Sequence, residues 1–255
     1  MPEHDPERAA PAWLTDGTTE DEVLGLLKTG KEAEVFIVER RTLDGERAAL
    51  LAHKRYRPTK VGKGEIEGLG FTRSRTFTND VVYHEGRRLR YSRDQRAVER
   101  MTDYGKRLLA ERWPGQELDT LRQAHEAGVT VPFPVEFTGD GMLMQLIGDA
   151  GGAAPRLVNA RLTAAELAGA YEQLLDELSA LTRSGLVHAD LSPFNVLWWK
   201  GRLWLIDFPQ AVDLVSNPHG FDLLHHDVVT MCTWFARRGI DTDGEEVFAA
   251  LVADA

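Results

Sequence analysis

The sequence predicts a two-lobed α+β fold in which a strand-rich part precedes a helical part. Runs in which apolar and polar residues alternate, a pattern typical of strands, dominate residues 33–57 and recur over 131–148. Amphipathic patterns with a repeat near 3.6 residues dominate from residue 162 onward. Strands followed by helices favour two packed parts of different character, with a cleft between the lobes.

The N-terminal elements are expected to be a leader followed by a hairpin. Residues 1–20 contain several prolines and acids and are expected to form a disordered or loosely attached leader. A short helical pattern in EVLGLLK, residues 22–28, passes into a strand at EVFIVE, residues 34–39. A turn at 43–46 leads to a second strand at AALLAHKRYR, residues 48–57, so the two strands predict a hairpin.

The middle of the chain predicts an insertion, two helices and two more strands. Residues 58–100 carry five glycines and many charges with little periodicity, which indicates a long flexible insertion. The helical pattern of residues 96–113 is interrupted by Pro114-Gly115 and restarts at Gln116, with Gly128 as a C-terminal cap. Two strands separated by the turn TGDG follow, at 131–137 and within 141–148.

The second half predicts helices around one hairpin. A strong amphipathic helix covers 162–185 and stops at a glycine. A hairpin with the turn Lys200-Gly201 follows, and two helical segments complete the chain, at 221–239 and 245–255. The predicted domains are the leader 1–20, an N-lobe over 21–147 that includes the insertion 58–100, and a C-lobe over 148–255.

Composition excludes several classes of protein. The 255 residues are 43% hydrophobic and 27% charged, which is typical of a globular protein. No segment reaches the roughly 18 uncharged apolar residues that a membrane span needs, and the acidic N-terminus is unlike a secretory signal. We therefore expect a cytoplasmic protein without a membrane partner. The lone Cys232 lies in an apolar run that indicates a buried helix, and it excludes a disulfide framework.

Charge is distributed unevenly along the chain. The formal net charge is −10, yet residues 54–107 carry 15 Lys and Arg against 7 Asp and Glu, a local +8, which leaves −18 for the remainder. A solvated charged loop and helix face is one explanation. The alternative is a contact with RNA or another polyanion.

The segments LVHADLSPFNVL, residues 186–197, and IDF, residues 206–208, place polar residues around an apolar hairpin. The rigid hairpin can hold Asn195 and Asp207 in a fixed relation, so that both share a divalent cation, because Mg²⁺ prefers oxygen ligands. Asp190 is expected to face a substrate hydroxyl or water as a base or orienting group. This division of tasks is that of phosphoryl transfer in protein kinases.

Phosphoryl transfer also needs a cation on the nucleotide side. Lys54 lies in a strand that follows the glycine-bearing segment TGKEA, where a kinase places the lysine that binds the α and β phosphates. Such a lysine needs an acidic partner on a helix. Glu117 is the natural candidate, and the alternative is that it is an ordinary exposed helix acid.

These segments together resemble the RIO family of atypical protein kinases, in the branch that lacks an N-terminal winged helix. TGKEAEVF is similar to that family's STGKEANVY phosphate loop, and AHKRYRP to its AVKIYK strand. HADLSPFN and IDFPQAVD resemble H-A-D-L-S-E-Y-N and I-D-x-S-Q-S-V. RWPGQELDTLRQAHEAGVTVPFP and MLMQLIGDAGGAAPRL resemble its W-A-E-K-E-x-R-N-L helix and its hinge followed by A-P-R-L. The matches run from about residue 28 to about residue 215.

The resemblance implies a protein-kinase-like fold with a nucleotide cleft, use of ATP with Mg²⁺ or Mn²⁺, and serine/threonine kinase or ATPase activity. It implies Asp190 and Asp207 as catalytic residues, Asn195 and Asp207 as metal ligands, and Asp207 as a group that can accept phosphate. Met144 would be the gatekeeper. The implied nucleotide-binding residues are Thr29, Gly30, Lys31, Glu32, Val35, Lys54, Glu117, Met144, Gln145 and Ile147.

The resemblance is incomplete on the substrate side. Pro193-Phe194 replaces Glu-Tyr of the family, and Phe208-Pro209 replaces the residues that usually follow the metal-binding aspartate. The protein substrate is therefore left unidentified. Family members act in ribosome maturation, so a contact of residues 54–107 with RNA or the ribosome is an implied alternative to a solvated face.

Two other functions fit the same residues. H-x-D-L-x-P-x-N followed by I-D-F is also the pattern of small-molecule kinases such as aminoglycoside and choline phosphotransferases. A nucleotide-gated binding module is the other, in which ATP hydrolysis or an aspartyl-phosphate switches attachment to an RNA–protein particle.

Several polar or aromatic residues have structural explanations. His188 is expected to anchor its loop by packing and hydrogen bonding. The Trp198, Trp199 and Trp204 cluster reads as hairpin core rather than a stacking platform for bases. His225, His226 and Asp227 read as helix surface and core rather than as metal ligands.

Overall fold

The structure, a computed structural model, describes residues 10–30, 33–57 and 103–254, with side chains outside 103–114. Two compact units make up these residues. The sheet unit contains Ala10–Asp119 and Pro134–Gln145, and the helical unit contains Thr120–Phe133 and Leu146–Ala255. The units thus separate between Gln145 and Leu146, and Thr120–Phe133 joins the helical unit although the sequence placed it in the N-lobe. The predicted insertion 58–100 lies outside the described residues.

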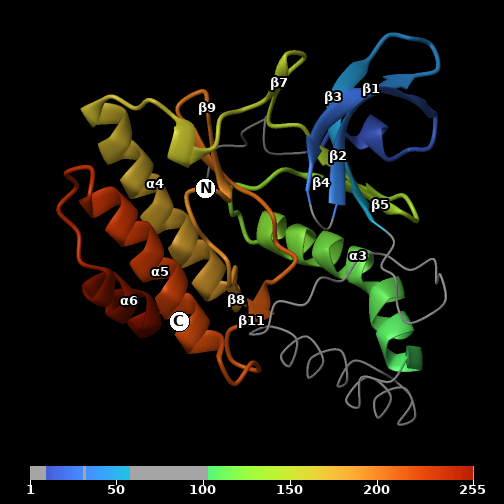
Figure 1. Cartoon of the computed structure of the whole chain (residues 1–255). Coiled ribbons are helices and arrows are strands. Elements are labelled where there is room, and N and C mark those ends of the chain that lie inside the picture. The colour runs from blue at the N-terminus through green and yellow to red at the C-terminus, as the bar shows by residue number, and fades with distance from the viewer. Residues whose placement is uncertain (1–9, 31–32, 58–102, 255) are drawn as a thin grey trace. The chain divides into compact units, whose positions relative to one another are not determined.

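The sheet unit is built on five antiparallel strands in the order β1-β2-β3-β5-β4 (Figure 1). The predicted hairpin is β2 and β3, and the predicted strands after the long helix are β4 and β5. With helices dominating the second half, the predicted kinase-like α+β fold is confirmed. The strands are β1 (Thr19–Thr29), β2 (Ala33–Thr42), β3 (Ala48–Tyr56), β4 (Pro134–Phe137) and β5 (Gly141–Gln145).

One expectation for the N-terminal region is wrong. The segment EVLGLLK is not helical but belongs to β1, where Val23 pairs with Val38 and Lys28 with Val35. Seven residues are too few for a stable helix on their own, whereas pairing with β2 satisfies the backbone groups of the strand that face β2. Of the expected leader, residues 1–9 lie outside the described residues; in the described end, Leu14 of the short 3₁₀ helix η1 (Ala12–Leu14) is fully buried.

A buried arginine ties the sheet unit together. Arg40 on β2 donates to both carboxylate oxygens of Asp21 on β1, at 2.7 and 2.8 Å, and to the carbonyl oxygen of Leu14 at 2.7 Å. It also pairs with Glu136 on β4. The hydrogen bond to Asp21 raises the pKa of Arg40 above its ordinary value. Since two strands separate β2 from β4 in the sheet order, this reach requires a curved sheet.

The helix α3 (Asp103–Glu126) corrects a second expectation, because it continues through Pro114-Gly115 without a break. A proline inside a helix removes one backbone hydrogen bond and crowds the carbonyl four residues earlier, at a cost of about 3 kcal/mol that other contacts of the helix have to offset. The turns after Gly115 are anchored by Glu117, Leu118, Leu121 and Ala124, all buried. The predicted glycine stop is confirmed, since Gly128 has φ +84°.

The helical unit packs three helices around small antiparallel ladders, as predicted. In α4 (Ala164–Arg183), Thr163 and Glu166 form a capping box. It packs with α5 (Gly220–Ala236) and α6 (Gly244–Ala253) (Figure 1), and the predicted burial of Cys232 in α5 is confirmed. The short elements are β6 (Gly148–Asp149), β7 (Gly152–Ala153), η2 (Leu157–Asn159), β8 (Leu186–Val187), β9 (Val196–Trp199), β10 (Arg202–Leu205) and β11 (Val212–Asp213).

The predicted hairpin of β9 and β10 is confirmed. Its turn residues Lys200 and Gly201 both have positive φ, 49° and 77°, which is the conformation that two-residue hairpin turns require. Within the described part of the chain, no helix combines the length and apolar character that crossing a membrane requires.

The contact of β5 with β3 predicts a severe cost for one small substitution. A Cβ atom at Gly141 would lie 2.0 Å from the carbonyl oxygen of Lys54, so Gly141→Ala must push the two strands apart. We expect the free energy of unfolding to fall by about 1–3 kcal/mol in a urea titration. Gly169→Ala in α4 is the control, because its Cβ meets nothing within 4 Å and alanine favours the helix. A Gly141→Ala chain as stable as the wild type would contradict the strand spacing.

Candidate functional site

The loop from His188 to Asn195 is held by a buried carboxylate of α5. The backbone N–H groups of Ala189 and Leu191 donate to the two oxygens of Asp227, at 2.8 and 2.9 Å. Asp227 is 1% exposed, and Asp190, between the two donors, is exposed. Ala189 has φ +65°, a left-handed conformation that a non-glycine residue keeps only when its surroundings impose it. The clamp therefore directs Asp190 away from the core.

A second set of hydrogen bonds joins Asn195 to Asp190. The Asn195 side-chain amide donates to the Asp190 carboxylate at 3.1 Å and to its backbone carbonyl at 2.9 Å. The backbone N–H of Asn195 closes a turn on Ser192 at 2.8 Å. Because the amide nitrogen is directed at Asp190, the amide oxygen is the Asn195 atom suited to meet a cation.

Asp207 stands at the base of the hairpin that also carries Asn195. The residue before it, Ile206, donates its N–H to the Asn195 carbonyl at 3.0 Å and accepts from Nε2 of His188 at 3.1 Å. The structural role expected for His188 is thus observed, since its buried ring also packs against Phe208 at 4.5 Å. Asp207 itself is exposed and has φ +73°. These bonds place Asn195 and Asp207 in the fixed relation that the sequence predicted.

The hairpin is fixed along both outer edges. On the β9 side, the N–H of Trp198 donates to the Pro155 carbonyl at 2.9 Å. On the β10 side, the N–H of Leu203 donates to the Gln173 side chain at 3.0 Å, and that of Leu205 to the Thr130 carbonyl at 2.9 Å. A two-stranded hairpin alone is marginally stable, so these contacts give it a definite position. Trp204 is buried in its core, as expected.

The sheet unit contains the predicted pair of Lys54 and Glu117. Nζ of Lys54 on β3 donates to the Glu117 carboxylate at 2.6 Å, and the Tyr56 hydroxyl donates to the other oxygen. Glu117 is 2% exposed, so it is not an ordinary surface acid. Lys54 pairs with Val35 and Ala52 with Met144 across the sheet, and opposite residues project to one face, which Lys54, Val35 and Met144 therefore share. The role of Lys54, Glu117, Val35 and Met144 in nucleotide binding stays a prediction.

The predicted phosphate loop is described only at its ends. Thr29 is the last residue of β1, and the N–H of Gly30 donates to the Ala33 carbonyl at 2.8 Å. A Cβ at Gly30 would lie 3.0 Å from that same oxygen, so the turn favours glycine. Lys31 and Glu32 lie outside the described residues, as does most of the basic segment 54–107.

The predicted adenine contacts fall where the two units join in sequence. Gln145 ends β5 and pairs with Leu51, whereas the side chain of Ile147 is buried with Ala154, Leu197 and Trp204 in the helical unit. The carbonyl of Ile147 accepts from the N–H of Ala154 at 2.8 Å. An adenine contact by Ile147 therefore has to come from its backbone, and for both residues it stays a prediction.

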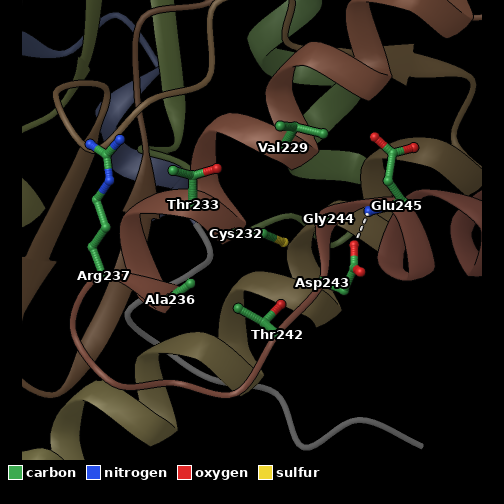
Figure 2. Close-up of a pocket in the computed structure, with 9 residues that line it drawn as sticks. All are labelled: Val229, Cys232, Thr233, Ala236, Arg237, Thr242, Asp243, Gly244 and Glu245. Carbon is green, nitrogen blue, oxygen red and sulfur yellow. Dashed lines mark hydrogen bonds between the residues drawn. The ribbon is translucent and has the colours of Figure 1, made fainter.

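A pocket of about 450 Å³ lies elsewhere, between α5 and the start of α6 (Figure 2). Its lining contains none of the predicted site residues. Cys232 faces it, and burial raises the pKa of that thiol, which disfavours the reactive thiolate. The lining residues are Val229, Cys232, Thr233, Ala236, Arg237, Thr242, Asp243, Gly244 and Glu245.

Asp227 is the functional residue that the sequence reasoning missed. It was grouped with His225 and His226 as helix surface and core. The available signal was its place on the apolar face of the helix, three residues after Leu224 and four before Met231, both buried. An acid on such a face must accept hydrogen bonds. Burial, and to a lesser extent the charge of Asp190, raises the pKa of Asp227 to about 7.

The fold, the contact of Asn195 with Asp190 and the contact of Lys54 with Glu117 are those of a protein of the protein-kinase-like class. Comparisons with known proteins identify the family within this class. The model of the RIO domain matches residues 75–247. Mouse (Mus musculus) serine/threonine-protein kinase RIO3 is 30% identical over 86% of this chain and 39% of its own length. The RIO-type serine/threonine-protein kinase Rio1 of Haloferax volcanii is 34% identical over 56% of this chain and 48% of its own.

The archaeal Rio1 kinase of Thermoplasma acidophilum is 31% identical over 53% of this chain and 69% of its own length. Because the family model covers more than half of the sequence, the chain belongs to the RIO domain family. The chain spans less than half the length of the mouse and Haloferax proteins that it matches.

The buried Asp227 predicts a defined dependence of stability on pH. A carboxyl whose pKa is raised from 3.8 to about 7 by folding contributes stability that is complete below pH 3.8 and is lost as the pH rises through 7. The free energy of unfolding of the wild type should therefore fall relative to that of Asp227→Asn as the pH rises from 4 to 7. Above pH 7 the difference between the two proteins should be constant. Urea titrations at several pH values measure it, and a difference independent of pH contradicts the raised pKa.

Proposed function

We propose that this chain is a serine/threonine protein kinase of the RIO type, which uses ATP and a divalent cation. The observation that carries the proposal is the hydrogen bond from the Asn195 amide to the exposed Asp190 carboxylate. It joins a base candidate and a metal-ligand candidate on one clamped loop. The names of the relatives, which are serine/threonine-protein kinases, support the same reaction class.

Asp190 would accept the proton of a serine or threonine hydroxyl. The hydroxyl oxygen then forms a bond to the γ phosphorus of ATP while the bond from that phosphorus to the β–γ bridging oxygen breaks, which releases ADP. Lys54, held by Glu117, would neutralise the α and β phosphates. The contacts of Glu117 with Lys54 and Tyr56 support this role, because they fix the direction of the ammonium group.

A divalent cation fits the residues present. The exposed Asp207 carboxylate and the Asn195 amide oxygen are both oxygen donors, which Mg²⁺ and Mn²⁺ prefer. Two protein ligands are few, but Mg²⁺ commonly completes its shell with water and phosphate oxygens. When bound, the cation would neutralise charge on the phosphates. We propose Mg²⁺ as the resident ion, with Mn²⁺ as the alternative.

The other two functions receive less support. The relatives named above are protein kinases rather than aminoglycoside or choline phosphotransferases. A contact with RNA or the ribosome depends on residues 54–107, most of which lie outside the described residues.

Replacement of Asp190 tests the proposal directly. With γ-labelled ATP, Mg²⁺ and a generic protein acceptor, Asp190→Ala should lower phosphoryl transfer by about 10²–10⁴-fold, the usual contribution of a general base. ATP binding measured by calorimetry should persist, because Asn195 keeps its bond to the backbone carbonyl of residue 190. Asp176→Ala, an exposed acid on α4, is the matched control. Full activity of Asp190→Ala would remove the assignment.

The chemical nature of the label separates kinase from switch. Label that survives acid and hydroxylamine is on serine or threonine and supports the kinase. Label that hydroxylamine releases, and that Asp207→Asn abolishes, is an aspartyl-phosphate and favours an ATPase switch instead.

A further inference from the structure

A buried glutamate on α4 lies outside the residues assigned so far. Glu177 is 9% exposed on the helix face that also buries Leu174, Leu178 and Leu181. Its carboxylate accepts the backbone N–H of Thr130 at 2.6 Å. Burying a carboxylate costs free energy unless hydrogen bonds compensate, so a glutamate at this position needs an explanation.

The contacts of Thr130 lead toward the candidate metal ligands. The Thr130 carbonyl accepts the N–H of Leu205 at 2.9 Å, on the outer edge of β10. Two residues later the chain reaches Asp207, and the intervening Ile206 donates its N–H to the Asn195 carbonyl. Two hydrogen bonds, joined by the backbone of Thr130, thus connect Glu177 to Leu205, two residues before Asp207.

Glu177 contributes to the register of Thr130 against β10. The peptide of Thr130 lies in the connection between α3 and β4, where no sheet ladder pairs its N–H. A hydrogen bond from a backbone amide to an ionised carboxylate is roughly twice as strong as a neutral one. The carboxylate therefore fixes the backbone N–H of the residue whose carbonyl, in the next peptide group, holds the last residue of β10.

We propose that Glu177 is a positioning residue for the phosphoryl-transfer site, which acts through Thr130 and Leu205 to hold Asp207 in place. The inference rests on the proposed function, since it assigns Asp207 to the cation of that reaction. Glu177 does not contact the reacting groups. Its effect should appear in the requirement for the cation, because residues that orient metal ligands typically change metal affinity or activity by about 10–100-fold.

The chain offers a matched control on the same helix and the same strand. Gln173, one turn before Glu177, accepts the N–H of Leu203 and donates to the Gly201 carbonyl, both at 3.0 Å. It therefore supports β10 near the turn, at the end away from Asp207. Gln173→Leu removes a similar side-chain acceptor from β10 but should leave the base of the hairpin in place.

The first measurement is amide hydrogen exchange of the full chain. Glu177→Leu should speed the exchange of Thr130 and Leu205, whereas Gln173→Leu should speed that of Leu203. The second measurement is the rise in melting temperature on adding ATP, with Mg²⁺ and with EDTA. Glu177→Leu should lose most of the Mg²⁺-dependent part of the rise, and Gln173→Leu should keep it.

The third measurement is phosphoryl transfer against Mg²⁺ concentration. Glu177→Leu should raise the half-saturating Mg²⁺ concentration by about 10-fold, with Gln173→Leu within about twofold of the wild type. Equal shifts in both variants would mean general destabilisation and overturn the inference. If Glu177→Leu does not fold, Glu177→Gln decides, because its neutral bond should raise the half-saturating Mg²⁺ by about 2–3-fold, and an unchanged value overturns the inference.

Failure of this inference is distinguishable from failure of the proposed function. A wild type that transfers phosphate while Asp190→Ala does not, combined with an unchanged Mg²⁺ requirement in the Glu177 variants, removes the role of Glu177 alone. A wild type that neither transfers phosphate nor gains stability from ATP with Mg²⁺ overturns both.

Discussion

The hydrogen bonds from Ala189 and Leu191 to the Asp227 carboxylate are the constraint on which the candidate site depends. They hold the loop on both sides of Asp190, so that a left-handed residue and an exposed acid occupy defined positions in a segment without regular structure. Asp227 is itself fixed because α5 buries Leu224, Val228 and Met231 in the core. The hydrophobic packing of α5 thereby fixes the geometry of the polar loop that carries Asp190.

Buried carboxylates recur wherever this chain must fix a polar element. Glu117 directs Lys54 in the sheet unit, Asp227 holds the loop of Asp190, and Glu177 holds the N–H of Thr130, whose carbonyl supports β10. Each accepts hydrogen bonds from groups that no helix or sheet ladder satisfies. An isolated buried carboxyl group would be costly, but one whose oxygens accept such bonds fixes direction as well as position. The apolar residues between Asn195 and Asp207 keep the hairpin rigid.

Much of the fold followed from local pattern. The hairpins, the amphipathic helix of residues 162–185 and the glycine at 128 were predicted because alternation, helical repeat and glycine each report local conformation. The predictions were wrong where contacts with residues distant in sequence determine the secondary structure. The segment 22–28 became a strand because β2 was available to pair with it, and α3 passed through Pro114 because the turns after Gly115 are anchored in the core.

The sequence by itself determined the residue types of the site and their order, because each lies in a short motif whose spacing reflects its chemistry, whereas the pairing of Lys54 with Glu117 was expected from the resemblance to kinases and is observed in the structure. Only the tertiary structure revealed Asp227 and Glu177 as supports of the site. Their partners are backbone N–H groups 36 to 47 residues away. Every residue except proline carries such a group, so the sequence contains no signal that identifies which amide a buried carboxylate will bind.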